Sequence, residues 1–289
     1  MSASPSPSSS HQPPIWKAYF FLTRLHLWPT GTILYFWPCA WALAMCAYSL
    51  SIPPKTVAIQ TLAYFIGSTI RHDAACIWND ICDMDLDGKV ERTKGRPLPS
   101  GRVSVLGALL FLAAHWAILL GGLNLMGPDA FKLGLVGLLT FEWIYPLSKR
   151  FTNWPQVWGG LGIAWGFVVV WVSFTGSMDL NFLAPIVLGL ICWTIHFDTV
   201  YARQDWKEDS KAGVYSCAIY FGNYMRPILT FFTMVFVTSL AYVGYLNGQG
   251  PLYFLISVAG SAVHFIWQLS NPELGTGKDS SKLFQVCAN

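Results

Sequence analysis

Long apolar segments alternate with short polar connections along almost the whole chain. Eight of these segments approach or exceed the roughly 20 residues that a helix needs to cross a bilayer. Their expected cores are residues 27–50, 56–78, 104–122, 131–147, 156–175, 182–200, 227–246 and 250–269. The pattern predicts an all-α fold, a polytopic membrane helical bundle with about eight transmembrane helices.

The two ends of the chain differ from its apolar middle. Residues 1–14 are rich in Ser and Pro and contain no Lys or Arg, so we expect a disordered tail without the Arg-rich character of a mitochondrial transit peptide. A short amphipathic piece at residues 16–25 is expected to lie along the membrane interface. Residues 15–270 are then one transmembrane domain, and residues 271–289 are a polar C-terminal tail.

Composition supports a membrane protein and argues against a nucleic-acid-binding protein. Of the 289 residues, 54% are hydrophobic and 11% are charged, whereas roughly a quarter of the residues of a soluble domain are charged. The net charge of +3 and the lack of a basic stripe with interleaved aromatic residues argue against nucleic-acid binding. The 7 cysteines are scattered without a CxxC pair, so we interpret them as small buried hydrophobic residues.

The distribution of Lys and Arg predicts the orientation of the bundle. With eight spans, Lys55 and Lys132 are the only two of the 18 basic residues that fall on one side of the membrane. Cytoplasmic connections carry the positive excess in membrane proteins. We therefore expect both termini and the connections after the second, fourth and sixth spans to be cytoplasmic.

Acidic residues gather at the cytoplasmic ends of two expected spans. Ten of the 15 Asp and Glu lie in residues 73–91 and 198–209. If the preceding helices continue, acids at spacings i, i+3, i+7 and i, i+7, i+11 share one helical face, and Asp85 points elsewhere. The acids that share a face are Asp80, Asp83 and Asp87 in the first stretch and Asp198, Asp205 and Asp209 in the second.

Carboxylates stacked in this way repel each other and require a compensating cation. Together with the amide of Asn79 they are hard oxygen ligands, which Mg²⁺ accepts while it bridges to substrate phosphates. Two such helix ends that face each other can hold two metal ions on one diphosphate. The candidate metal ligands are Asn79, Asp80, Asp83, Asp87, Asp198, Asp205 and Asp209, and the candidate catalytic residues among them are Asp80, Asp83, Asp198 and Asp205.

Three other interpretations of the acids compete with metal binding. A solvated acidic helix end explains one cluster as well as metal binding does, but two clusters of matching phase at the same membrane depth disfavour it. Asp83, Asp85 and Asp87 begin like an EF-hand loop, yet the twelfth position is Lys94, where a bidentate Glu is needed. An ion-coupled transporter places acids along a transmembrane path, whereas these acids gather at one interface.

Basic residues follow the first acidic cluster and the fourth span. Residues 89–102 contain three Arg and two Lys, and Lys149 and Arg150 occupy the corresponding position after the fourth span. These charges are either the inside-positive signal or ligands for phosphate oxygens, which Arg can bind with two parallel hydrogen bonds. For Lys149 and Arg150 the two interpretations weigh equally.

The chain resembles the UbiA superfamily of intramembrane prenyltransferases, most closely its 4-hydroxybenzoate polyprenyltransferase branch. Residues 79–87 resemble the first family motif NDxxDxxxD, and residues 198–209 resemble the second, DxxYAxxDxxxD. Residues 145–156, which include Tyr-Pro-Leu-x-Lys-Arg-Phe and Trp-Pro-Gln, resemble a third stretch, and residues 24–38 resemble the first helix. The likeness runs from about residue 20 to residue 225.

The resemblance implies a helical bundle, usually of nine spans, with a membrane-facing cavity capped by the two Asp loops. The ninth span is expected to be missing here. It also implies roles for basic and aromatic residues beside the acids. The residues implied in diphosphate binding are Arg92, Lys94, Arg96, Lys149, Arg150 and Tyr201, and the residue implied in acceptor binding is Arg24.

The implied reaction is the Mg²⁺-dependent transfer of a prenyl group, with farnesyl expected, from a prenyl diphosphate to an aromatic small molecule. We expect a phenolic polyketide of meroterpenoid secondary metabolism as acceptor, with 4-hydroxybenzoate of ubiquinone synthesis as the alternative. The expected partners are these substrates and the lipid bilayer, without nucleic acid or an obligate protein partner. An endoplasmic reticulum or Golgi membrane is expected rather than the mitochondrial inner membrane.

Overall fold

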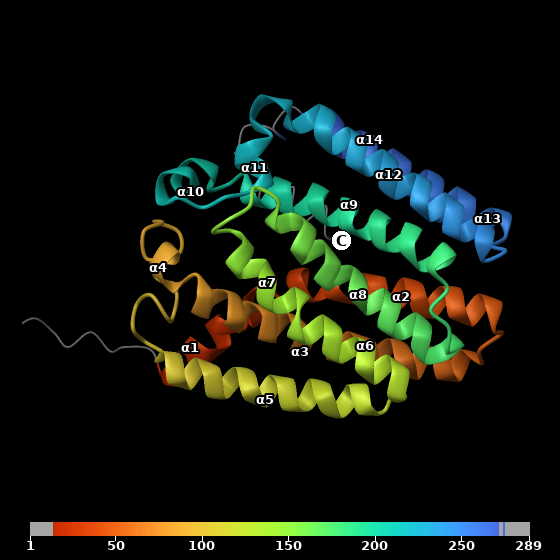
Figure 1. Ribbon diagram of the computed structural model, residues 1–289, viewed down its shortest axis with the longest axis horizontal. Helices are drawn as coiled ribbons and strands as arrows, with labels where there is room; N and C mark the ends of the chain where they lie inside the picture. Colours follow the sequence, from red (N-terminus) through yellow and green to blue (C-terminus); the bar gives the residue numbers. More distant parts are fainter. Residues whose placement is uncertain (1–13, 272–273, 275–289) are drawn as a thin grey trace, which may run out of the picture.

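The computed structural model describes residues 14–271 and residue 274, and these residues form helices and connections without a strand (Figure 1). The long helices run side by side as one bundle. In chain order the elements are α1 (Ile15–Leu22), η1 (Leu25–Leu27), α2 (Thr30–Ser49), α3 (Pro54–Cys82), α4 (Met84–Asp87), α5 (Val105–Asn124), α6 (Pro128–Leu139), α7 (Phe141–Ser148), α8 (Pro155–Thr175), α9 (Leu180–Ala202), α10 (Trp206–Ala212), α11 (Cys217–Tyr220), η2 (Gly222–Tyr224), α12 (Met225–Leu246), α13 (Pro251–Tyr253), η3 (Phe254–Ala259) and α14 (Gly260–Ser270).

All eight expected spans are helical, so the predicted fold class is confirmed. Among the described residues, seven helical segments can cross a membrane by length and composition, and α3 is the expected span that is not among them. At 29 residues α3 is long enough, but its second half carries charged side chains such as Arg71, Asp73 and Asp80. The interfacial piece expected before the first span is helical as α1.

Several helices begin where the sequence supplies a suitable first turn. Proline opens α3, α6, α8 and α13, because a proline at the first helical position has no N–H to leave unpaired and its φ is already helical. At the start of α5, the side chain of Ser104 accepts a hydrogen bond from the Gly107 N–H. Asp179 accepts one from the Asn181 N–H at the start of α9.

Helices α8 and α9 form the centre of the bundle. They pack against each other, and α2, α6 and α7 surround α8 while α12 covers α9. A Cβ at Gly160 would lie 2.9 Å from the Ile191 Cα, so this glycine permits the close approach of α8 and α9. The outermost helices are α5 and the segment from α13 to α14, whose side chains are mostly exposed and therefore face lipid.

The fourth span differs from the single helix expected at residues 131–147. It is divided at Thr140, whose φ of −120° and ψ of −72° lie outside the helical region, into α6 and α7. Pro146 inside α7 lacks an N–H, so the Glu142 carbonyl loses its usual helical partner, but the break itself lies six residues before this proline. The division makes α7 a short separate helix.

The two ends of the bundle are unequal, as the charge distribution predicts. Figure 1 shows α1, α4, α10 and α11 gathered at one end, whereas the other end carries the brief connections between long helices. The connections after α3, α7 and α9 all lie at the first end, which we name the polar end. Almost all of the two expected tails, residues 1–14 and residues 271–289, lies outside the described residues. The expectation that a ninth span is missing concerns the same C-terminal region and is not tested by the structure.

Candidate active site

The first acidic motif lies where α3 meets α4 at the polar end. Asp80 belongs to the last turn of α3, and Asp83 is the junction residue with φ −93° and ψ 4°. The helix therefore does not continue unbroken, but Asp80, Asp83 and Asp87 are all buried, at 0%, 5% and 8% exposure. The side chain of Asp85 is 58% exposed and points elsewhere, as the helical spacing predicts.

The second acidic motif is also divided between two helices. Asp198 lies in the last turns of α9, which ends at Ala202. Asp205 precedes α10, and Asp209 lies in its first turn. The expectation of one continuous helix face is therefore wrong for this motif, because the chain leaves the helix for three residues. The motif still lies at the polar end, opposite α4 (Figure 1).

Three basic residues from separate segments neutralise the first motif. The Nη2 atom of Arg24 lies 2.5 Å from Asp80 Oδ1. Arg96 Nη1 lies 2.6 Å from Asp87 Oδ2 and 3.3 Å from Asp80 Oδ1. The Lys149 ammonium donates to Asp83 Oδ2 at 2.7 Å and to the side-chain oxygen of Asn79 at 2.8 Å. Basic residues that are 9 to 66 positions away in sequence thus converge on these acids.

The segment after the first motif reaches the second motif. Arg92 forms an ion pair of 2.5 Å with Asp205, and its guanidinium lies 6.0 Å from the centre of the Tyr201 ring. The Glu91 N–H donates to the carboxylate of Glu208 at 3.2 Å. Because these contacts join residues more than 110 positions apart, the two acidic motifs face each other across one site.

Lys149 also contributes to the second motif from its position after α7. Its positive charge acts on Asp198 as well as on Asp83. Tyr145 and Gln156, two residues to which the sequence pattern assigned no role, lie beside Asp198 and stabilise its ionised form. The signal for Tyr145 was present, because it lies four residues before Lys149 and therefore on the same face of a helix. The Lys149 ammonium lies 5.1 Å from the centre of the Tyr145 ring.

Two of the predicted diphosphate-binding residues have other partners. Lys94 pairs with Glu91 at 2.7 Å, and both side chains are more than half exposed. Arg150 donates to Asp85 Oδ1 and to the Cys82 carbonyl, both at 2.6 Å. The structure therefore brings together Arg92, Arg96 and Lys149 with the acids and leaves Lys94 and Arg150 at the edge of the site. Their roles stay predictions.

The electrostatics of the site favour bound cations. Burial raises the pKa of Asp209 to about 6, and the neighbouring charge of Asp205 adds to the increase. Burial also raises the pKa of Asp87, although Arg96 opposes the change. The exposed Asp85 behaves in the opposite way, because its hydrogen bond with Arg150 lowers its pKa. Keeping the buried acids ionised together therefore requires positive charge beside them.

The donor set fits Mg²⁺, although the acids are held by basic side chains. Asp80 Oδ2 and Asp83 Oδ1 are buried and have no hydrogen-bond partner in the structure, so each offers a free oxygen. Among the described residues, no three His, Cys, Asp or Glu side chains are grouped as a ready metal site. Metal binding here therefore requires the carboxylates to exchange some of their Arg and Lys partners for the ion.

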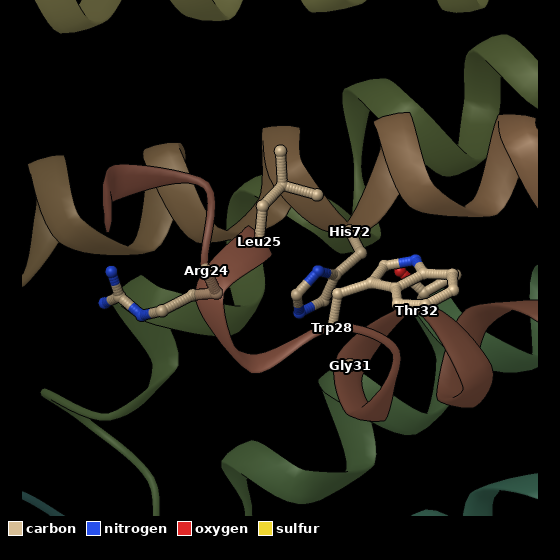
Figure 2. A pocket seen from close by; sticks show the side chains of 6 residues that line it. All are labelled: Arg24, Leu25, Trp28, Gly31, Thr32 and His72. Atoms are coloured by element: carbon tan, nitrogen blue, oxygen red, sulfur yellow. The ribbon is translucent and has the colours of Figure 1, made fainter. Parts of the chain in front are cut away.

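A narrow hollow lies beside Arg24, between the start of α2 and the middle of α3. It is lined by Arg24, Leu25, Trp28, Gly31, Thr32 and His72. Figure 2 shows the guanidinium of Arg24 directed away from His72, and its partner is Asp80. A Cβ at Gly31 would fall 1.9 Å from His72 Nε2, so only glycine leaves room for the imidazole. The predicted acceptor-binding role of Arg24 stays a prediction, because its charge is engaged with the first motif.

Comparisons with known proteins identify the family. The model of the UbiA prenyltransferase family matches residues 35–289. A UbiA prenyltransferase of Ampulloclitocybe clavipes is 40% identical over 288 residues, which is 100% of this chain and 91% of that protein. A mitochondrial 4-hydroxybenzoate polyprenyltransferase of Schizosaccharomyces pombe is 36% identical over 276 residues, with 95% of this chain and 76% of that protein covered.

Solved structures share the fold. The apo structure of a UbiA homologue from Aeropyrum pernix superposes with a TM-score of 0.72 at 24% identity, covering 90% of this chain and 94% of that chain. A UbiA homologue from Archaeoglobus fulgidus, solved bound to GPP and Mg²⁺, gives a TM-score of 0.65 at 19% identity and covers 94% of this chain and 98% of that one. Fold, motifs and relatives agree, and the chain belongs to the UbiA prenyltransferase family.

Proposed function

We propose that this membrane enzyme transfers a prenyl group from a prenyl diphosphate to an aromatic acceptor and uses Mg²⁺. The observation that carries the proposal is the meeting of two acidic motifs around Lys149, with Arg92 and Arg96 beside them. Such a site binds a polyanion through metal ions and basic side chains together. The Archaeoglobus fulgidus homologue that shares the fold is bound to GPP and Mg²⁺, which supports the same use here.

The metal would be held by the acids of both motifs. The proposed ligands are Asn79, Asp80, Asp83, Asp87, Asp198, Asp205 and Asp209. When bound, Mg²⁺ supplies the positive charge that stabilises a departing pyrophosphate. In the structure that charge comes from Arg24, Arg92, Arg96 and Lys149. We infer that these basic side chains turn from the carboxylates to the phosphate oxygens when substrate and metal enter together.

Lys149 is placed to act on the bond that breaks. Its ammonium bonds Asp83 of the first motif, and its positive charge also acts on Asp198 of the second. We infer that a diphosphate that uses both motifs sits beside this ammonium. A positive charge held there stabilises the negative charge that develops on the leaving oxygen as the allylic C–O bond breaks. The prenyl group then reacts as a cation with the electron-rich ring of the acceptor, and the ring carbon loses its proton.

Aromatic side chains line the bundle below the second motif. Trp193, one and a half turns deeper in α9 than Asp198, has its ring centre 5.4 Å from that of Trp41 and 6.3 Å from that of Phe236. Aromatic faces stabilise a nearby cation by about 0.5–2 kcal/mol each. A wall of this kind also excludes the water that would capture the cation as an alcohol.

For the acceptor, we propose a phenolic polyketide of secondary metabolism, with farnesyl as the group transferred. The fungal relative named a UbiA prenyltransferase, at 40% identity, supports a family member outside ubiquinone synthesis. The alternative is 4-hydroxybenzoate, the substrate named for the Schizosaccharomyces pombe relative. A transporter is the alternative of another class, and family membership argues against it.

The proposed location is limited to a membrane that the chain crosses several times. Relatives named as mitochondrial, including those of Schizosaccharomyces pombe and Arabidopsis thaliana, do not support the expected preference for an endoplasmic reticulum or Golgi membrane. Fractionation of cells that express the full-length protein, with organelle markers, distinguishes the two locations.

Mass spectrometry of reaction products tests the proposed activity. Membranes containing the protein are given a panel of prenyl diphosphates of increasing length, each with phenolic polyketides and with 4-hydroxybenzoate. We expect a C-prenylated aromatic product, with farnesyl diphosphate and a polyketide acceptor giving the highest kcat/KM. Transfer to 4-hydroxybenzoate alone would replace the proposed acceptor by the alternative, and flux into liposomes without any product would support a transporter.

Removal of divalent cations is expected to abolish the transfer. Without divalent cations, the site loses its main source of positive charge. The anionic diphosphate then meets the seven proposed oxygen ligands directly, and nothing stabilises the departing pyrophosphate. The rate after treatment with EDTA should fall below detection and return when excess Mg²⁺ is added. Undiminished transfer in EDTA would contradict a metal-dependent reaction. Ca²⁺ in place of Mg²⁺ is the control, because this ion has the same charge but a larger radius.

A further inference from the structure

A buried ion pair lies deep in the bundle, away from the acidic motifs. Arg71 of α3 and Glu142 of α7 have side chains that are 15% and 11% exposed, and their closest atoms are 2.6 Å apart. Arg71 precedes Asp80 by nine residues, which places it about 14 Å from the first motif along the helix axis. Charges at such a depth in a membrane protein are costly and usually serve a function.

The pair is part of a closed network that joins four helices. Arg71 donates from Nε and Nη2 to Glu142 Oε1 at 2.9 and 2.6 Å, and from Nη2 to the Gly162 carbonyl of α8 at 2.5 Å. Tyr35 of α2 donates to Glu142 Oε2 at 3.3 Å, and its ring centre lies 5.0 Å from the Arg71 guanidinium. Because both carboxylate oxygens are already paired, the network is built to hold helices together rather than to receive a ligand.

One face of α7 connects this network to the active site. Glu142, Tyr145 and Lys149 follow each other at i, i+3 and i+7, so they lie along the same side of the helix. Glu142 is held by Arg71 at the deep end, whereas Tyr145 and Lys149 contact the acids at the polar end. The break at Thr140 separates α7 from α6, so the position of α7 depends on its own contacts.

We propose that the Arg71–Glu142 pair is a positioning element for diphosphate binding. It fixes α7 against α3, so that the Lys149 ammonium stands between the two acidic motifs. A hydrogen bond of 3.3 Å from Trp78 Nε1 of α3 to the Trp143 carbonyl of α7 lies between the pair and the site and adds to the same attachment. The inference rests on the proposed function, since it assigns Lys149 to the diphosphate. Neither Arg71 nor Glu142 touches the reacting atoms.

The main test removes both charges with Arg71→Met and Glu142→Leu in one protein. Replacing a buried ion pair by apolar residues of similar size is often neutral for stability, so the variant is expected to stay folded in detergent. Its affinity for a farnesyl thiolodiphosphate with Mg²⁺, measured by calorimetry, should weaken about tenfold or more, because a small displacement of Lys149 has a large effect. The KM for the donor should rise with it, and the KM for the acceptor should change less than about threefold.

A double-mutant cycle with Lys149 separates positioning from general stability. If the pair acts through Lys149, removing it in a Lys149→Met background should weaken binding of the same probe no further. Additive losses in the two backgrounds would overturn the inference, as would wild-type affinity in the variant that lacks the pair. Glu142→Gln, which keeps the size of the side chain, provides the same comparison if the double substitution does not fold.

The matched control is the ion pair of Asp129 and Lys132 at the other end of the same broken span. Both side chains are about 70% exposed, and their atoms are 3.1 Å apart. Asp129→Asn with Lys132→Met is expected to leave binding and transfer unchanged. Failure of the wild-type protein to bind the probe would overturn the proposed function itself. Binding and transfer by the wild type, with no change in the Arg71 and Glu142 variants, would overturn only the positioning role.

Discussion

Asp83→Asn is expected to reduce the rate of prenyl transfer at least about a thousandfold, which corresponds to about 4 kcal/mol in the reaction barrier. The side chain of Asp83 is 7% exposed, its Oδ2 accepts from Lys149 and its Oδ1 has no partner. An amide of the same size has no negative charge with which to hold Mg²⁺ on the diphosphate. Initial rates in membranes, at saturating donor and Mg²⁺, measure the loss.

The substitution is chosen so that the fold survives. Asparagine keeps the volume of Asp83, and Lys149 retains the side-chain oxygen of Asn79 as an acceptor at 2.8 Å. The neighbouring Asp85→Asn is the control, because that carboxylate is 58% exposed and pairs with Arg150 outside the cluster. We expect it to stay within about threefold of the wild-type rate, as surface ion pairs contribute little. Similar losses in both variants would contradict the assignment of Asp83 to the metal.

Lys149→Met should lower kcat/KM for the prenyl diphosphate about a hundredfold or more. Methionine keeps most of the aliphatic stem and removes the charge that bonds Asp83 and also acts on Asp198. Loss of one preorganised group that stabilises developing negative charge has an effect of this size in other enzymes. The KM for the acceptor should change little, because the ammonium faces the acids and the diphosphate.

Arg150→Met is the matched variant at the next position. Its guanidinium is 40% exposed and bonds Asp85 and the Cys82 carbonyl, so we expect a loss at least tenfold smaller than that of Lys149→Met. Steady-state kinetics with varied donor concentration measure both variants in the same preparation. Equal losses would mean that Arg150 turns toward the diphosphate when substrate binds, as the sequence motif implies, and would remove the distinction drawn between the two residues.

Much of the fold could be predicted from the sequence because membrane spans obey a local rule. Every backbone polar group in the bilayer core must be paired within its own helix, so twenty apolar residues are sufficient to indicate a span. The breaks at Thr140 and Asp83 could not be predicted from hydropathy, since both depend on local backbone geometry.

The candidate site was predictable in its acids and much less in its contacts. Helical spacing predicts Asp80, Asp83 and Asp87 on one side and Asp85 on the other, and the burial of the first three and the exposure of Asp85 agree with it although the helix is broken at Asp83. The partners of these acids come from positions up to 66 residues away, and no pattern within the motif specifies them. Tyr145 and Gln156 were missed for the same reason, because their partner Asp198 belongs to another helix.

By itself the sequence determined the class of protein, a bundle of about eight helical spans, and the two acidic motifs that lie at one end of it, since each follows from hydropathy, charge or spacing within a segment. Only the tertiary structure decided that Lys149 bonds Asp83 of the first motif, that Lys94 and Arg150 pair elsewhere, and that α7 is a separate helix held by Arg71. The reason is physical: burial and ion pairing depend on which helices pack together, and that depends on contacts between residues far apart in the chain.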